Sequence, residues 1–176
     1  MQQYSITNYL KDVRKVIDEH THENPDEIIL VGHSVGGYIS IIAGERYAEI
    51  TKIVSLCPPS GFDNPPVKWK GKEYRVCQRD LPNDPTTFRE FKVPIAFAYD
   101  SFTYNAIEAV KRIEKPLMIL IALADTVVPP QDTEKLVMAA RNPYSIRLEG
   151  VGHNFRYSKE DCAIVMDEIE KFLSKV

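Results

Sequence analysis

Residues 28–37 read Ile28-Ile29-Leu30-Val31-Gly32-His33-Ser34-Val35-Gly36-Gly37, an apolar run that passes directly into glycines around a serine. The β-branched run is typical of a strand buried on both faces, and residues 38–47 continue with helical periodicity. A serine with glycines two places before and two places after it, between a strand and a helix, predicts a sharp turn that exposes the hydroxyl. Ser34 is therefore the candidate nucleophile, and a simple packing turn is the alternative.

The rest of the chain alternates helix-like and strand-like segments. Apolar spacing predicts helices at 6–22, 38–47, 105–113, 131–140 and 161–173, and short apolar runs predict strands at 28–31, 52–57, 117–123 and 144–148. Such alternation predicts an α/β fold with a parallel sheet that is covered by helices on both faces. With 176 residues, of which 44% are hydrophobic, we expect one domain over residues 1–176.

Residues 58–104 interrupt this alternation. They hold more than half of the chain's 12 prolines and most of its aromatic residues. The stretch is too short for a core of its own, so we expect a small aromatic-rich cap inserted over the sheet, with a hairpin at 69–74. Its aromatic side chains would either line an acyl or aryl pocket or only pack the cap on the sheet, and the sequence favours neither.

A serine hydroxyl needs a neighbouring base, and the base needs an acid that orients it. His153 follows the strand at 144–148 in a loop with glycines nearby, so it is the candidate base. Asp125 directly follows the apolar run at 117–124 and is the candidate acid. A solvated loop histidine and a turn aspartate are the corresponding alternatives.

The weaker candidates for these two roles are His20, His22, His33, Asp63 and Asp100. The first two histidines fall at the end of the first helix, where a histidine interacts with the helix C-terminus. The side chain of His33 is expected to point away from the serine. Neither of the two aspartates follows a clear strand end.

Three segments together carry a family resemblance: Gly32-His33-Ser34-Val35-Gly36-Gly37, Asp125-Thr126-Val127-Val128-Pro129 and Gly152-His153-Asn154-Phe155. They resemble the α/β-hydrolase superfamily, in which the serine, the acid and the histidine occur in this chain order. Within it, the chain is most similar to small acyl esterases of the feruloyl/cinnamoyl esterase and serine-aminopeptidase-like lipase groups. One departure is Ala122, because these groups often have a glycine three positions before the acid.

The resemblance implies hydrolysis of a small-molecule carboxylic ester through an acyl-enzyme. In that reaction Ser34 would attack, His153 would transfer the proton and Asp125 would orient His153. The backbone N–H of Val35 would donate to the oxyanion. A peptide, thioester or lipid acyl group would use the same residues, and the sequence does not separate these substrates.

The resemblance also implies a larger sheet than the four strands that the sequence pattern supplies. The earlier strands, and a His-Gly loop that provides the second oxyanion donor, have no counterpart, so we expect the C-terminal part of a longer hydrolase. The strand at 28–31 would then be an open apolar edge through which two copies could pair as a homodimer. A non-catalytic fragment that acts as an interaction module is the alternative from another class.

Charge and composition narrow the range of partners. The formal net charge is −3, so nothing favours nucleic acid. The longest apolar run, residues 117–124, is far shorter than the roughly 20 residues of a membrane span, and the sequence opens without a signal-peptide pattern. The three cysteines lack CxxC spacing, which indicates free thiols in a reducing, cytoplasmic compartment. No motif for a metal or a cofactor is found.

Overall fold

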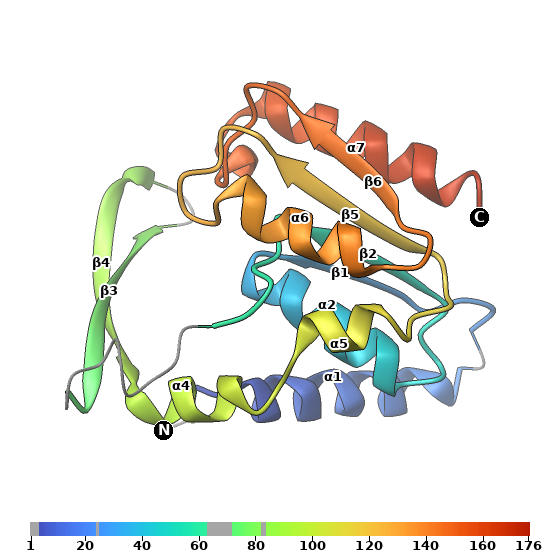
Figure 1. Cartoon of the computed structure of the whole chain (residues 1–176), viewed down its shortest axis with the longest axis horizontal. Helices are drawn as coiled ribbons and strands as arrows, with labels where there is room; N and C mark the ends of the chain where they lie inside the picture. Colours follow the sequence, from blue (N-terminus) through green and yellow to red (C-terminus); the bar gives the residue numbers. More distant parts are fainter. Residues whose placement is uncertain (1–3, 24, 63–71, 82–83) are drawn as a thin grey trace.

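A computed structural model describes residues 4–23, 25–62, 72–81 and 84–176. Its centre is a parallel sheet in the order β1-β2-β5-β6 (Figure 1). The strands are β1 (Ile29–His33), β2 (Lys52–Leu56), β5 (Leu117–Ala122) and β6 (Tyr144–Leu148). Val54 of β2 lies opposite Val31 of β1 and Met118 of β5, and β5 pairs in parallel with β6. The predicted strands and their parallel arrangement are thus confirmed.

Helices cover both faces of the sheet, as predicted. They are α1 (Ile6–Thr21), α2 (Val35–Arg46), α4 (Ile95–Phe102), α5 (Ala106–Val110), α6 (Pro130–Ala139) and α7 (Lys159–Leu173), with a 3₁₀ turn at Phe155–Tyr157. Side chains of α1, α2, α5 and α6 form one core cluster with Ile53 and Ile119 of the sheet. Side chains of α7 form a second cluster with Val54 and Leu120 on the opposite face. In the described residues, no helix has the length and apolar character needed to cross a membrane.

Three of the helices begin after a residue whose side chain caps the helix N-terminus. Ser5, Asn105 and Ser158 precede α1, α5 and α7, and each side chain accepts a hydrogen bond from a backbone N–H of the first turn. The residue before α2 is Ser34, whose side chain makes no such capping bond. The helix begins at Val35, three residues earlier than predicted, so it starts directly beside the candidate nucleophile.

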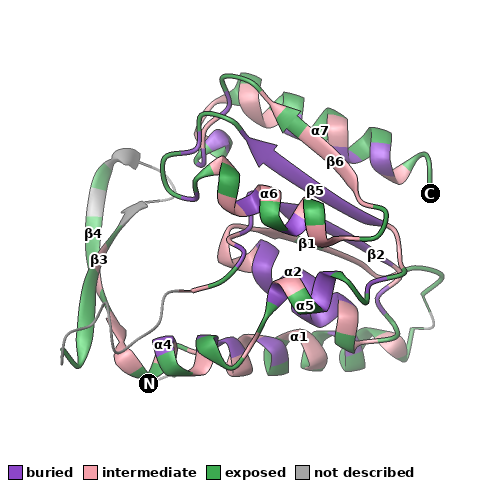
Figure 2. Ribbon diagram, viewed as in Figure 1, coloured by how far each residue is buried: buried purple, intermediate pink, exposed green. Residues whose placement is uncertain are grey.

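β1 is less buried than its sequence predicts. All residues of β2 and β5, the two central strands, are buried (Figure 2). Val31 of β1, in contrast, keeps 51% of its surface exposed. Among the described residues, β1 pairs only with β2 and is therefore an edge strand. The prediction of burial on both faces is wrong here, because an apolar run does not reveal how many neighbours a strand has.

The described part of the predicted insertion contains an antiparallel hairpin. β3 (Tyr74–Leu81) pairs with β4 (Asp84–Pro94), and Cys77 lies opposite Phe91. Figure 1 shows the hairpin beside the sheet, on the side where β5 and β6 end, and not over one of its faces. Of the hairpin that the sequence predicts at 69–74, residues 69–71 lie outside the described residues, and residues 72–74 lead into β3.

α4 joins the hairpin to the start of α1. Asp100 on α4 accepts hydrogen bonds from the backbone N–H of Thr7, at 3.0 Å, and from the Thr7 hydroxyl. The Tyr104 hydroxyl lies 2.6 Å from the same threonine oxygen. A carboxylate is favoured at a helix N-terminus by the unpaired N–H groups and the helix dipole. Asp100, one of the weaker candidates for the acid, therefore anchors α1 and lies away from the other candidate residues.

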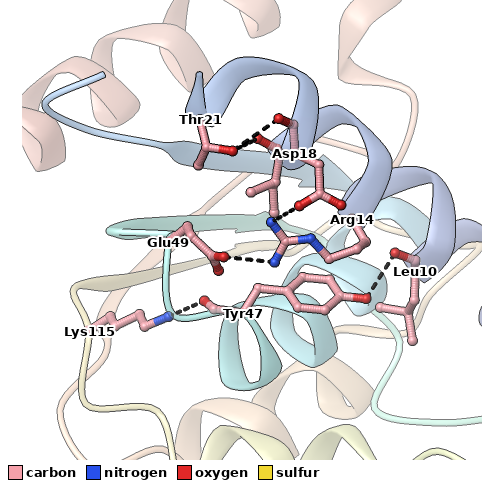
Figure 3. A network of polar contacts seen from close by, with 8 residues as sticks. Leu10, Arg14, Asp18, Thr21, Tyr47, Glu49 and Lys115 are labelled. Atoms are coloured by element: carbon pink, nitrogen blue, oxygen red, sulfur yellow. Dashed lines mark hydrogen bonds and ion pairs between the residues drawn. The ribbon is translucent and has the colours of Figure 1, made fainter. Parts of the chain in front are cut away.

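Polar contacts also tie the middle of α1 to the segment after α2 (Figure 3). The Arg14 guanidinium pairs with Asp18 at 2.6 Å and with Glu49 at 2.9 Å. It also lies 5.1 Å from the ring centroid of Tyr47, whose hydroxyl donates to the carbonyl of Leu10 at 3.0 Å. Exposed ion pairs contribute about 0–1 kcal/mol each, so the buried apolar stripe of α1 holds this helix more strongly than they do.

Candidate active site

Ser34 occupies a strained turn between β1 and α2. Its backbone has φ 57° and ψ −123°, in a region that residues with a side chain rarely adopt. The Ser34 N–H donates to the carbonyl of Leu56 at the end of β2, at 2.8 Å, which holds the turn at the carboxyl edge of the sheet. The backbone conformation is thus fixed by the neighbouring strand, and the hydroxyl is free to meet groups from other loops.

The glycines around Ser34 are not equivalent. A Cβ at Gly32 would lie 2.1 Å from the carbonyl oxygen of Gly36 and 2.3 Å from Oγ of Ser40. A Cβ at Gly37 would lie 2.9 Å from Oγ of Ser55, whereas a Cβ at Gly36 would meet nothing within 4 Å. The close approach expected of the motif therefore requires glycine at position 32 and favours it at 37. The corresponding expectation for Gly36 is wrong, because this residue already belongs to α2 and faces open space.

The loop after β6 brings His153 to the serine. Its Nε2 lies 3.0 Å from Ser34 Oγ, and the residue is only 8% exposed. Gly150 adopts a positive φ of 73° in the turn that leads into this loop. The carbonyl of Val151 accepts a hydrogen bond from the N–H of Ala124 at 3.0 Å, so the loop is fixed to the end of β5.

The loop after β5 brings Asp125 to the histidine. Asp125 Oδ2 lies 2.6 Å from His153 Nδ1, and the carboxyl group is 99% removed from solvent. Its other oxygen, Oδ1, accepts hydrogen bonds from the N–H groups of Val127 and Val128, both at 2.8 Å. Both carboxyl oxygens are therefore occupied, and the carboxyl group can rotate only by breaking one of these bonds.

The structure thus brings together three of the predicted site residues, Ser34, His153 and Asp125, in one continuous hydrogen-bonded row. Val35, the predicted oxyanion donor, is the first residue of α2, where a backbone N–H has no acceptor within the helix. A hydroxyl, an imidazole and a buried carboxylate in this order can activate the hydroxyl as a nucleophile. No group of three or more metal-binding side chains occurs in the described residues.

The remaining candidates lie elsewhere, with one exception. His20 and His22 are exposed at the end of α1, and Asp63 falls outside the described residues. The exception is His33, whose ring centroid lies 4.7 Å from that of His153. Its side chain turns towards the base, and sequence reasoning missed this contact. Its only sequence signal is its place at the end of a strand, directly before the serine.

His33 should make the folded protein sensitive to acid. Burial, followed by the positive charge on His153, lowers the pKa of His33 from 6.5 to about 4. Between pH 6.5 and 4 the unfolded chain therefore binds more protons at this residue, so stability falls as the pH falls through that window. The shift corresponds to at most about 3 kcal/mol. We expect His33→Phe to lose less stability than wild type between pH 7 and pH 4.5 in urea unfolding, whereas exposed His22→Ala should match wild type.

A small apolar recess lies between the hairpin and the helices. Its volume is about 170 Å³, and its walls include Phe62, Val93 and Phe97. The Phe62 ring packs edge-on against Phe97 at 5.5 Å and against Tyr38 at 5.0 Å. Tyr38 lies one helical turn after Ser34 on α2, so one aromatic contact separates the nucleophile helix from a wall of the recess.

The α/β-hydrolase fold is defined by a parallel sheet with a serine on a strand-to-helix turn. An aspartate and a histidine that follow later in the chain reach this serine from two further loops. The chain belongs to the Alpha/beta hydrolase family, whose sequence profile matches residues 3–165. The resemblance found in the sequence is thereby confirmed. Among curated proteins, none matches the chain significantly.

Solved structures show the same fold at low sequence identity. A monoacylglycerol lipase from Paleococcus ferrophilus is 18% identical, with a TM-score of 0.73 over 99% of this chain and 77% of that chain. Est1E from Butyrivibrio proteoclasticus is 17% identical, with a TM-score of 0.71 over 97% of this chain and 70% of that chain. A second structure of Est1E contains bound ferulic acid. The esterase domain of a Rhodothermus marinus protein is 20% identical, with a TM-score of 0.64 over 89% of this chain and 64% of that chain.

Proposed function

We propose that the chain is a serine hydrolase that cleaves a carboxylic ester through an acyl-enzyme. The observation that carries the proposal is the position of His153, which lies within hydrogen-bond distance of both Ser34 Oγ and Asp125 Oδ2. Family membership and the esterase and lipase structures of the same fold support it.

The reaction proceeds in two halves. Ser34 Oγ attacks the ester carbonyl carbon while His153 Nε2 takes the hydroxyl proton, and the carbonyl oxygen becomes an oxyanion. When this intermediate collapses, the alcohol leaves with the proton from His153, and the acyl group stays on Ser34. A water molecule then attacks the acyl-enzyme with His153 again acting as base, which releases the carboxylic acid. Asp125 stabilises the imidazolium in both halves.

The oxyanion is assigned to the N–H of Val35 and the N-terminal end of α2. Val35 is the one donor that we assign among the described residues. Loss of one oxyanion donor typically lowers turnover about 10²–10³-fold. We propose an activated ester, p-nitrophenyl acetate, as the assay substrate.

The recess lined by Phe62, Val93 and Phe97 supports a compact acyl or aryl group. A dry cavity of roughly 150 Å³ holds one benzene molecule, so a recess of about 170 Å³ accommodates one ring or a short chain. A panel of p-nitrophenyl esters from acetate to palmitate measures this directly. Rates that rise steadily up to the longest chain would contradict a compact acyl group, and matched thioesters and amides would separate the other acyl substrates.

Covalent labelling tests the reaction class. A fluorophosphonate probe reacts with an activated serine, so we expect one probe per chain, and peptide mapping should place it on Ser34. Heat-denatured protein is the control, because labelling that depends on His153 and Asp125 requires the folded site. A folded protein that takes up no probe, or takes it up at another serine, would contradict the proposal.

A second candidate function, a non-catalytic interaction module, is favoured by the exposure of β1. This edge strand has an apolar sequence, and Val31 is 51% exposed. Edge strands that stay unpaired usually carry charges or prolines that prevent association, and β1 has neither. Concentration-dependent dimers in size exclusion, together with absent probe labelling, would favour this function over ester hydrolysis.

A further inference from the structure

The ring of His33 packs against the candidate base. Its ring centroid lies 4.7 Å from that of His153, with the planes inclined by 43°. The side chain directly before the nucleophile is therefore in contact with the imidazole ring of the base.

The surroundings of His33 hold it in place. The Phe155 ring packs edge-on against it at 5.1 Å, with an interplanar angle of 77°. Its Nε2 is buried and has no hydrogen-bond partner among the described residues. Buried polar atoms are usually paired, and an unpaired one costs free energy. The unpaired nitrogen of His33 therefore needs an explanation, such as a role of this residue in the site. The next residue along the chain is Ser34, so β1 fixes the nucleophile and this histidine together.

We propose that His33 is a positioning residue, whose ring holds the imidazole of His153 between Ser34 Oγ and Asp125 Oδ2. The inference rests on the proposed role of His153 as the base. The residue between Gly32 and Ser34 would then need a flat, uncharged side chain that packs against the ring of the base.

The charge state of His33 is compatible with this role. The charged groups that face it are His153, Arg156 and Asp125, and burial is the largest cause of its lowered pKa of about 4. His33 is therefore neutral at pH 7. When His153 becomes an imidazolium, the neutral His33 ring adds no positive charge beside it, and Asp125 supplies an opposing charge.

Proton NMR tests the positioning independently of ester hydrolysis. A proton held between His153 Nδ1 and Asp125 Oδ2, 2.6 Å apart, gives a signal far downfield of the amide region. The signal is assigned by its loss in Asp125→Asn. We expect His33→Ala to broaden or abolish it by exchange with water, His33→Phe to retain it because the ring contact remains, and exposed His22→Ala to leave it unchanged.

Kinetics supply the second measurement. Rates are expressed per active site, with sites counted by probe labelling, so that unfolded protein does not enter the comparison. We expect kcat of His33→Ala to fall at least about tenfold with KM little changed, and His33→Phe to stay within about threefold of wild type, because a misplaced base slows the chemical step and not substrate binding.

The outcomes separate the positioning role from the proposed function. Loss of the downfield signal in His33→Ala but not in His33→Phe supports positioning, even if no ester is hydrolysed. A signal in His33→Ala that matches wild type overturns it, even if Ser34 reacts with the probe. Equal loss in both variants with a parallel fall in Tm indicates a folding role only and also overturns it. If His33→Ala does not fold, His33→Asn takes its place in the same comparison.

Discussion

Replacing Ser34 by alanine is expected to lower kcat for p-nitrophenyl acetate about 10⁴–10⁶-fold, because removal of a triad nucleophile leaves only binding and oxyanion stabilisation. Nothing else should change much, because an alanine at this position would adopt the same positive φ with a side chain of similar bulk near the backbone. Initial rates of purified wild type and variant, with the rate in buffer alone subtracted, measure the effect.

Two further substitutions test whether the loss of activity is caused by unfolding. Ser34→Gly should be equally inactive yet more stable by about 1 kcal/mol, because glycine adopts the positive φ without strain. Loss of activity with gained stability cannot be caused by unfolding. Ser174→Ala, at the end of α7, should retain the wild-type rate. If Ser34→Ala still hydrolysed the ester at the wild-type rate, another group would have to be the nucleophile.

The second large effect is expected at Gly32, on stability. Its Cβ would lie 2.1 Å from the Gly36 carbonyl oxygen, which is a backbone atom and cannot move without displacing the start of α2. We expect Gly32→Ala to destabilise the fold by about 3 kcal/mol or more, a large share of the roughly 5–15 kcal/mol of a typical domain. Urea unfolding at pH 7 measures it.

Gly36→Ala is the matched control, because it changes the other glycine of the same motif. This position has open space around its Cβ and lies within α2, where alanine is favoured over glycine by up to about 1 kcal/mol. We expect wild-type stability or slightly more. Equal destabilisation by the two substitutions would show that the motif as a whole resists side chains, and that the close contact at Gly32 is not the cause.

The sequence predicted those parts of the fold that depend on local patterns. The apolar runs of β2 and β5 indicated the central strands correctly, and the turn residues after β5 and β6 pointed to the loops that carry Asp125 and His153. These predictions succeed because parallel strands end at a common edge, so that residues after different strand ends meet there.

What the sequence could not predict are contacts between distant segments. The partial exposure of Val31 depends on the number of strands beside β1, which no residue of β1 encodes. The contact of His33 with His153 depends on how the end of β1 packs against the loop after β6. The open space at Gly36 depends on which segments surround the first turn of α2. Alternation along a strand predicts on which face of the sheet a side chain lies. His33 is the last residue of β1, where the chain already turns, so alternation does not predict the direction of its side chain.

The position of the site within the sheet has a consequence for folding. Among the described strands, Ser34 follows one edge strand of the sheet and His153 follows the other, 119 positions later, with β2 and β5 between them. The hydrogen bond between them therefore closes one of the longest loops in the chain. Such contacts are expected to form late in folding, because the chain loses entropy on closing the loop before the contact contributes free energy. We therefore expect Ser34 to be reactive only in the completely folded chain. A partly folded chain, even one with native helices, should not be reactive at Ser34.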